Sequence, residues 1–202
     1  MTLKIGKTDQ IPAFIAMQVM QNAQQLEAVG QDIMHLEVGQ PSTSPPAAVS
    51  RSLTAALDHT AAHGYSVALG LPALRQRIAD HYYDWYGLTP DWEKIAITPG
   101  SSLGFAIAFL AAFDAGDHIA IATPGYPAYR NLMIALGLVP DLIPARAEQN
   151  WMPNLEELGS TGNIPDGILL ASPANPTGTV MSDNDLAYIC GWCERHGVRL
   201  IM

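Results

Sequence analysis

The pattern of apolar and polar positions divides the chain into a helical first part and an alternating second part. In the first part, apolar residues recur at helical spacing, Gly30 marks a helix end, and Pro72 marks a helix start. The pattern predicts helices over 11–29, over 46–56 and from Pro72 onward, and a short extended segment over 33–38. From residue 95 onward, short runs rich in Ile, Val and Leu alternate with segments of helical character.

This second part predicts a sheet whose strands run in parallel. Strands that are apolar on both faces and alternate with helices are typical of a mostly parallel α/β sheet flanked by helices. Ser182 suits a helix N-cap and Gly197 suits a helix end. The predicted strands begin near Ile95, His118, Leu138, Gly167 and Val198, and the predicted helices cover 102–113, 127–136, 154–158 and 183–196. The last run stops at Met202, so we expect a truncated form of a longer protein rather than a terminal edge strand.

Composition narrows the classes of function. The chain has 202 residues, 49% of them apolar and 14% charged, which is enough to bury a substantial core. Lys and Arg number 10 against 19 Asp and Glu, and no basic run occurs, so nucleic acid and anionic membranes are not expected partners. No apolar run reaches the ~20 residues that span a bilayer, and no signal-peptide pattern is present, so a cytoplasmic location is expected.

The stretch ITPGSSLGFAIAF, residues 97–109, has two chemical interpretations. Residues 100–104 fit G-x-S-x-G between a strand and a helix, which would make Ser102 a hydrolase nucleophile, with Asp117 or Asp166 and then His196. Alternatively, Ser101 and Ser102 begin a helix whose unpaired N–H groups and dipole hold a phosphate. A third, structural interpretation is a simple helix cap. An oxyanion loop with consecutive glycines is missing, which disfavours the hydrolase.

Other motifs carry less weight. No two of the 17 glycines are separated by a single residue, which excludes a dinucleotide fingerprint, and the Gly6-Lys7 pair lacks the rest of a P-loop. Cys190 and Cys193 form C-x-x-C late in the predicted helix 183–196, where ordinary helix cysteines are the better interpretation. We expect no metal site, because too few ligands have suitable spacing.

Three loops should meet at one edge of the predicted sheet. Residues 100–102, 123–127 and 172–178 would all lie at the carboxyl ends of parallel strands, where open α/β sheets bind ligands. They offer phosphate donors, the aromatic face of Tyr126 and the amide of Asn175. A planar, aromatic, phosphorylated ligand suits this set.

A series of short motifs, in order, resembles the class I and II aminotransferases, which are fold-type I enzymes dependent on pyridoxal 5′-phosphate. The resemblance covers about 14–202. Its markers are Gly39, Tyr65, Gly70-Leu71-Pro72-Ala73-Leu74-Arg75, Thr98-Pro99-Gly100-Ser101-Ser102, Pro124-Gly125-Tyr126-Pro127-Ala128-Tyr129 and Asn175-Pro176-Thr177-Gly178.

The resemblance implies a role for each matching residue. Gly100, Ser101 and Ser102 would hold the cofactor phosphate, and Tyr126 would stack on the pyridine ring. Asn175 would hydrogen-bond the 3-oxygen of the ring, and its peptide bond to Pro176 is a candidate for the cis form.

Two further roles lie in the first part of the chain. Tyr65 would reach the phosphate of the neighbouring subunit in a homodimer, and the Gly39 backbone would lie against the substrate carboxylate. The resemblance also implies a domain division, with an N-terminal arm and part of a small domain over 1–45 and an incomplete cofactor-binding large domain over 46–202.

The resemblance further implies transfer of an amino group between an amino acid and a 2-oxoacid. The Schiff-base lysine of the family is expected beyond Met202, because the lysines here are Lys4, Lys7 and Lys94. We therefore expect this chain alone to hold no catalytic residue, to be inactive and to bind the cofactor weakly at best. Another fold-type I enzyme (a lyase, decarboxylase or synthase), a non-catalytic truncated product and a serine hydrolase stay open as alternatives.

Overall fold

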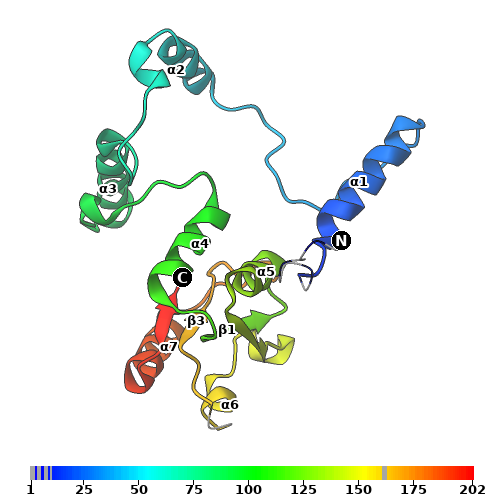
Figure 1. Ribbon diagram of the computed structural model, residues 1–202, viewed down its shortest axis with the longest axis vertical. Helices are drawn as coiled ribbons and strands as arrows, with labels where there is room; N and C mark the ends of the chain where they lie inside the picture. Colours follow the sequence, from blue (N-terminus) through cyan, green and yellow to red (C-terminus); the bar gives the residue numbers. More distant parts are fainter. Residues whose placement is uncertain (1–2, 4–5, 7–8, 10, 161–162) are drawn as a thin grey trace. The chain divides into compact units, whose positions relative to one another are not determined.

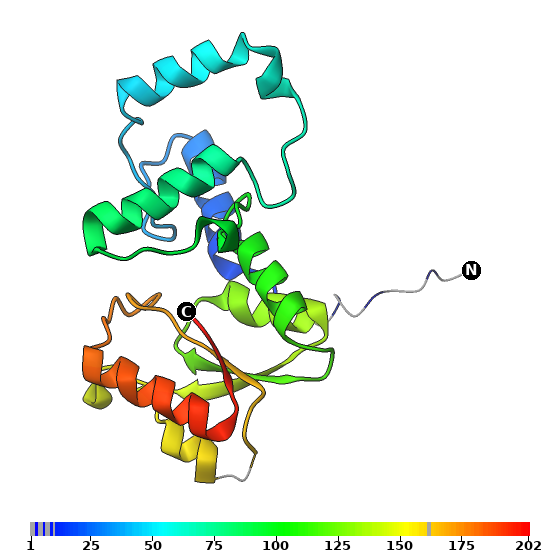
Figure 2. The same ribbon diagram turned by 90° about the vertical axis from the view of Figure 1, so that its left-hand side faces the viewer.

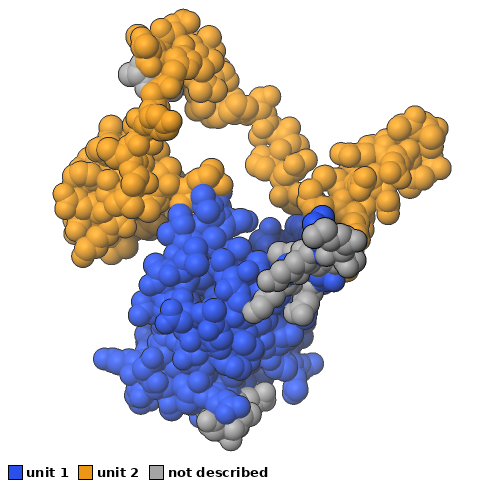
Figure 3. Space-filling model, in the orientation of Figure 1, with its two compact units in different colours: residues 1–14, 100–202 blue, residues 15–99 orange. Residues whose placement is uncertain are grey.

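The computed structural model describes residues 3, 6, 9, 11–160 and 163–202, so Lys4 and Lys7 lie outside the described residues. The chain divides into two compact units, coloured separately in Figure 3. Residues 1–14 and 100–202 form one unit, here named the sheet unit, and residues 15–99 form the other, the helical unit. The predicted domain boundary at residue 45 stays a prediction. Within the described ranges, no helix is both long enough and apolar enough to cross a bilayer.

The sheet unit contains a four-stranded parallel sheet with strand order β2-β1-β3-β4 (Figure 1). Ile121 on the central strand β1 pairs with Leu142 on β2 and with Leu169 on β3. The strands are β1 (His118–Thr123), β2 (Val139–Pro144), β3 (Gly167–Leu169) and β4 (Arg199–Ile201). The predicted parallel α/β fold is therefore confirmed.

Helices connect these strands, and local signals fix their ends. A proline occupies the first turn of α5 (Pro127–Leu136), where its missing N–H costs nothing. A capping box between Ser182 and Asp185 begins α7 (Asp183–His196), and Gly197 ends it, both as predicted. The other helices of this unit are α4 (Ser101–Ala112), the short α6 (Leu155–Ser160) and a 3₁₀ turn, η4 (Ala147–Gln149).

Side chains of the sheet alternate between two cores. Ile119, Ile121 and Leu169 face α4 and α5 and pack with Phe109 and Met133. The opposite face packs against α6 and α7, and Figure 2 shows α5 and α7 on opposite sides of the sheet. The buried residues of this second core are Ala120, Ile143, Leu155, Ile168, Leu170, Ile189, Trp192, Cys193 and Val198. Helices therefore cover both faces of the sheet, which leaves its carboxyl edge for a ligand.

The helical unit is built from α1 (Ile15–Ala28), α2 (Ala47–Leu57) and α3 (Pro72–Tyr86), with 3₁₀ turns η2 (Thr60–His63) and η3 (Trp92–Lys94). Its best-defined tertiary contact surrounds the buried Arg75. The Arg75 guanidinium donates to the carbonyls of Glu93 and Ile95, each at 2.6 Å, and lies over the Trp92 ring at 5.0 Å. This side chain joins α3 to η3 and to Ile95, which directly follows η3.

Two predicted extended segments are not strands. Residues 33–38 are irregular backbone, and the apolar run at 95–98 pairs with no strand in the described structure. The carbonyls of Glu93 and Ile95 accept hydrogen bonds from Arg75, and the Ile97 N–H donates to the carbonyl of Leu69. These loop and side-chain partners replace a strand ladder, so the strand predicted near Ile95 was wrong for this structure.

Candidate functional site

The three predicted loops project from one edge of the sheet. Residues 124–126 follow β1 and residues 170–178 follow β3, and these two strands are parallel neighbours. Helix α4 ends near the start of β1, where the Asp114 N–H donates to the Asp117 carboxylate. The 12 residues of α4 span about 18 Å, close to the ~20 Å length of the six-residue strand β1. Because α4 ends near the start of β1 and runs back along it, the N-terminus of α4 lies near the carboxyl end of β1.

The first of these loops places donors at the beginning of α4. Gly100 adopts φ +89°, a backbone conformation that favours glycine, and a Cβ added there would meet nothing within 4 Å. Ser101 and Ser102 are the first two helical residues, and both are exposed. The first N–H groups of a helix have no intrahelical acceptor and carry the positive end of its dipole. This turn therefore has the chemistry of an anion site.

The second loop brings Tyr126 beside that turn. Tyr126 is the half-buried N-cap residue of α5. One turn further along each helix, the rings of Phe105 on α4 and Tyr129 on α5 are in contact, with centroids 4.9 Å apart. Burial raises the pKa of Tyr129, and the neighbouring Tyr126 contributes in the same direction, so its phenol stays protonated. The contact sets the first turns of α4 and α5 side by side.

The third loop presents Asn175 at the same edge. Its backbone is closed by bonds from the Ala174 N–H to the Thr179 carbonyl, 2.9 Å, and from the Gly178 N–H to the Ala174 carbonyl, 2.7 Å. The Asn175–Pro176 peptide is cis, and the Asn175 side chain is exposed. An exposed amide on a closed turn can donate to a ligand oxygen.

Gly39 and Tyr65 belong to the helical unit. Gly39 is exposed in the irregular segment between α1 and α2, and a Cβ there would meet nothing within 4 Å. Tyr65 is fully exposed in the segment between η2 and α3. The roles expected for Gly39 and Tyr65 stay predictions.

The partners that a Ser102 nucleophile would need lie at the opposite edge of the sheet. Asp117 directly precedes β1 and Asp166 directly precedes β3, and the Asp166 carboxylate accepts the His118 N–H at 2.8 Å. His196 is the last residue of α7, before β4, and stacks on Trp192 with centroids 4.5 Å apart. The length of β1 separates the two edges by about 20 Å, far beyond hydrogen-bond reach. This geometry argues against the serine hydrolase.

The C-x-x-C pair and possible metal ligands are the remaining candidate sites. Cys190 is exposed and Cys193 is buried late in α7, where burial chiefly raises the pKa of the Cys193 thiol. Among the described side chains, no group of three His, Cys, Asp or Glu could hold a metal ion. These observations favour ordinary helix cysteines.

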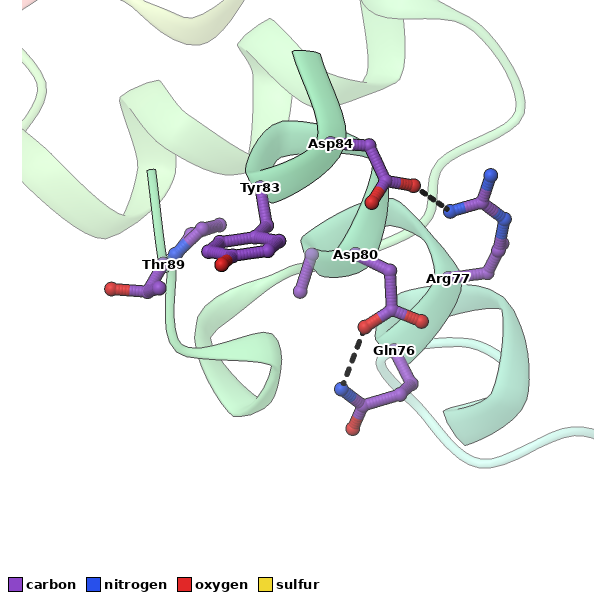
Figure 4. A pocket seen from close by; sticks show the side chains of 8 residues that line it. Gln76, Arg77, Asp80, Tyr83, Asp84 and Thr89 are labelled. Atoms are coloured by element: carbon purple, nitrogen blue, oxygen red, sulfur yellow. Dashed lines mark hydrogen bonds and ion pairs between the residues drawn. The ribbon is translucent and has the colours of Figure 1, made fainter. Parts of the chain in front are cut away.

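A hollow of about 550 Å³ lies on the helical unit (Figure 4). The polar groups of its wall pair with each other, Arg77 with Asp84 at 3.3 Å and Gln76 with Asp80 at 3.4 Å. None of the residues predicted for the site lines it. Its lining residues are Gln76, Arg77, Ala79, Asp80, Tyr83, Asp84, Thr89 and Pro90.

Comparison with known proteins identifies the family of the chain. The family model described as aminotransferase class I and II matches residues 31–202. The chain belongs to the class I and II aminotransferases. Members of this family use pyridoxal 5′-phosphate, and the donor turn, the aromatic ring and the amide described above fit a flat phosphorylated ring.

Individual aminotransferases match over nearly the whole chain. A valine–pyruvate aminotransferase of Mycobacterium tuberculosis is 43% identical over 201 residues, which cover 100% of this chain and 52% of that protein. An asparagine–oxo-acid transaminase of Streptococcus mutans is 27% identical, covering 89% and 46%. The crystal structure of an aminotransferase from M. tuberculosis superposes with a TM-score of 0.92 at 42% identity, covering 98% of this chain and 51% of that one. The chain thus spans about half the length of the relatives it matches.

The sequence argument missed the aromatic neighbours of Tyr126. Phe14 contacts Tyr126 edge-to-face, with centroids 5.9 Å apart, and Tyr129 does so at 5.2 Å. The spacing of Tyr126 and Tyr129 within the predicted helix start could have indicated the second contact. No local signal links Phe14 to a residue so distant in sequence.

Proposed function

We propose that these residues form the part of a pyridoxal phosphate-dependent aminotransferase that grips the cofactor without a covalent bond. One observation carries this proposal. In a chain of the aminotransferase family, Ser102 lies in the first turn of α4, and the turns bearing Tyr126 and Asn175 follow two neighbouring parallel strands at the carboxyl edge of the sheet. Such an edge is where open α/β sheets bind their ligands.

Each residue has a physical task. The N–H groups of Ser101 and Ser102 hold the phosphate, aided by the helix dipole, and Gly100 lets the backbone approach it closely. Tyr126 stacks on the ring, a contact worth about 0.5–1.5 kcal/mol beyond burial. The Asn175 amide donates to the 3-oxygen of the ring. Tyr65 contacts the phosphate across a homodimer, and the Gly39 backbone faces the substrate carboxylate.

The covalent part of the reaction requires residues that are not among these 202. When bound, the cofactor supplies an electron-accepting ring and an aldehyde carbon through which amino groups are exchanged. A lysine would be needed to hold the cofactor covalently and to move the proton, yet Lys4, Lys7 and Lys94 all precede the strands of the sheet in sequence. We expect no transamination from this chain alone.

The substrates of the whole enzyme are an amino acid and a 2-oxoacid. The M. tuberculosis relative supports valine and pyruvate as the first pair to assay, since it is 43% identical over the whole of this chain. A cytoplasmic location and a homodimer belong to the same proposal.

The decisive experiment measures ligand binding rather than turnover. The 202-residue chain is titrated by calorimetry with 4′-deoxypyridoxine 5′-phosphate, an analogue without the aldehyde, which cannot react with lysine. Ser101→Pro removes one N–H donor at a helix position that tolerates proline, whereas Ser101→Ala keeps the N–H and removes only the hydroxyl. We expect Ser101→Pro to weaken binding about 10-fold or more, because hydrogen bonds to charged groups contribute about 1.5–3 kcal/mol.

Tyr126→Ala and Asn175→Ala should each weaken binding by a smaller factor. Glu194→Gln, at an exposed position in the last turn of α7 at the opposite edge of the sheet, should leave binding unchanged. Binding that ignores Ser101→Pro, Tyr126→Ala and Asn175→Ala alike, or no binding to the unmodified chain at millimolar ligand, contradicts the proposal.

A further inference from the structure

Four aromatic rings form a continuous series beside the donor turn of α4. Phe14 meets Tyr126 at an interplanar angle of 84°, Tyr126 meets Tyr129 at 83°, and Tyr129 meets Phe105 at 69°. We name these four residues the aromatic chain. Phe105 and Tyr129 are carried by α4 and α5, whereas Phe14 comes from the N-terminal segment of the same unit.

Tyr126 depends on its neighbours for the orientation of its ring. As an N-cap residue with extended backbone (φ −66°, ψ 118°), it lies outside the helix, and its side chain is only half-buried. Two rings stand perpendicular to it, Phe14 and Tyr129, and edge-to-face packing from both hinders its rotation. Tyr129 is fixed by its helix and by Phe105, so Phe14 is the member whose position depends on a separate segment.

A hydrogen bond holds that segment on α5. The side-chain amide of Asn131 donates to the carbonyl of Pro12 at 3.2 Å. Pro12 restricts the backbone two residues before Phe14, so the Phe14 ring can occupy fewer positions. The segment is therefore anchored beside the ring that it contacts.

We propose that Phe14 is a positioning residue for Tyr126: it fixes the plane of the Tyr126 ring and, through it, the orientation of the flat phosphorylated ligand that stacks there. The effect on the ligand rests on the proposed function, whereas the effect of Phe14 on the Tyr126 ring does not. Phe14 touches Tyr126 and is not assigned to the ligand. Its removal should therefore change the orientation of the Tyr126 ring directly, and the affinity for the ligand only through that ring.

The first measurement needs no ligand. The 202-residue chain is labelled with 3-fluorotyrosine at its seven tyrosines, and the Tyr126 fluorine resonance is identified by its loss in Tyr126→Phe. A held ring places the fluorine in two unequal environments, whereas a freely rotating ring averages them. We expect Phe14→Ala to replace the wild-type pattern by one narrow averaged line.

The second measurement uses the bound analogue 4′-deoxypyridoxine 5′-phosphate. Its induced circular dichroism per bound molecule reports its orientation against the protein. Phe14→Ala should reduce this signal and weaken binding about two- to ten-fold, the range expected from losing one edge-to-face pair. Phe14→Tyr, which keeps the ring, should restore both signals. Asn131→Asp, which removes the donor to Pro12 at equal size, should give a smaller change in the same direction.

Ile11→Ala is the matched control, because it shortens a half-buried apolar side chain of the same segment and should change neither signal. If Phe14→Ala unfolds the chain, Phe14→Leu, which keeps the apolar volume, takes its place. Unchanged fluorine and dichroism signals in the folded Phe14 variant overturn the inference. If the wild-type chain binds no analogue while Phe14→Ala still frees the Tyr126 ring, the proposed function fails and the positioning of Tyr126 stands.

Discussion

The sheet unit and the helical unit are stabilised in different ways. Both faces of the sheet are covered, and residues such as Phe109, Ile119 and Ile168 are fully buried between sheet and helices. Among the residues of the helical unit whose burial is described, the buried ones are Ala23, Arg75 and Ala79, while large apolar side chains of α1, α2 and α3 stay exposed. The sheet unit therefore relies on its own apolar core, and the helical unit on specific polar contacts, with apolar helix faces left for other surfaces.

The largest expected effect tests the core of the sheet unit. Phe109→Ala empties the site of a fully buried ring on α4 and should lower the free energy of unfolding by about 3–5 kcal/mol. Urea denaturation followed by far-ultraviolet circular dichroism measures this loss.

The neighbouring residue Leu110 supplies the control, since it is 67% exposed on the same helix. Leu110→Ala should change the unfolding free energy by less than about 0.5 kcal/mol. Similar losses for the two variants would mean that α4 is not packed as described.

An intermediate effect tests the polar contact of the helical unit. Arg75→Met removes the two hydrogen bonds to the carbonyls of Glu93 and Ile95, and hydrogen bonds of charged groups contribute about 1.5–3 kcal/mol. The amide hydrogen of Ile97, which donates to Leu69, should therefore exchange about 10- to 100-fold faster. Hydrogen exchange of residues 93–97 measures the change.

Arg77 is the matched arginine on the same helix, because its side chain is 63% exposed and pairs with Asp84 at 3.3 Å. Exposed ion pairs contribute about 1 kcal/mol or less, so Arg77→Met should leave exchange at Ile97 nearly unchanged. Equally faster exchange of the Ile97 amide in both variants would contradict the proposal that the Arg75 hydrogen bonds hold this segment.

The smallest effect concerns a pH-dependent contact after α1. His35 lies between two carboxylates, with Nδ1 2.6 Å from Glu37 and Nε2 3.0 Å from Glu27. Hydrogen bonds to Glu37 first, and to Glu27 second, raise the pKa of His35 above its ordinary 6.5. Hydrogen bonding to His35 lowers the pKa of Glu37 below its ordinary 4.5.

The sign follows from these two directions. The stability contributed by protonated His35 is complete below pH 6.5 and is lost as the pH rises through the higher pKa of the folded state. The stability contributed by ionised Glu37 is complete above pH 4.5 and is lost as the pH falls through the lower pKa of the folded state. Titration of the His35 ring protons by NMR should show that Glu37→Gln lowers the His35 pKa more than Glu27→Gln does. Glu148→Gln, in the other unit, should leave that titration curve unchanged, and a curve unaffected by Glu37→Gln would refute the contact.

The sequence predicted the sheet unit better than the helical unit for a physical reason. The bounds of β1, α5 and α7 were predicted to within a residue or two, because proline, serine and glycine at their ends act locally. The strand expected near Ile95 did not form, because an apolar run does not reveal whether a partner strand is available. At Ile95 a buried arginine, 20 residues earlier in sequence, takes the carbonyl instead.

The candidate site divides in the same way. The shared edge of Tyr126 and Asn175 follows from the rule that parallel strands end together, so sequence could predict it. Ser102 lies in the first turn of α4 and follows no strand of the described sheet, so this rule does not place it. The contact of Phe14 with Tyr126 and the bond from Asn131 to Pro12, 119 residues apart, depend on the tertiary fold and leave no periodic trace.

The strand order has a consequence for how the chain folds while it is being synthesised. Strand β1 can pair with β2 soon after both emerge from the ribosome. Its other neighbour, β3, is made later, since Ile119 pairs with Gly167, 48 residues further along the chain. At translation rates of about 5–20 residues per second, one side of β1 waits for roughly 2–10 s before its partner strand is made. During that interval its unpaired backbone is open to chaperones and to other nascent chains, and we expect aggregation during expression to begin there.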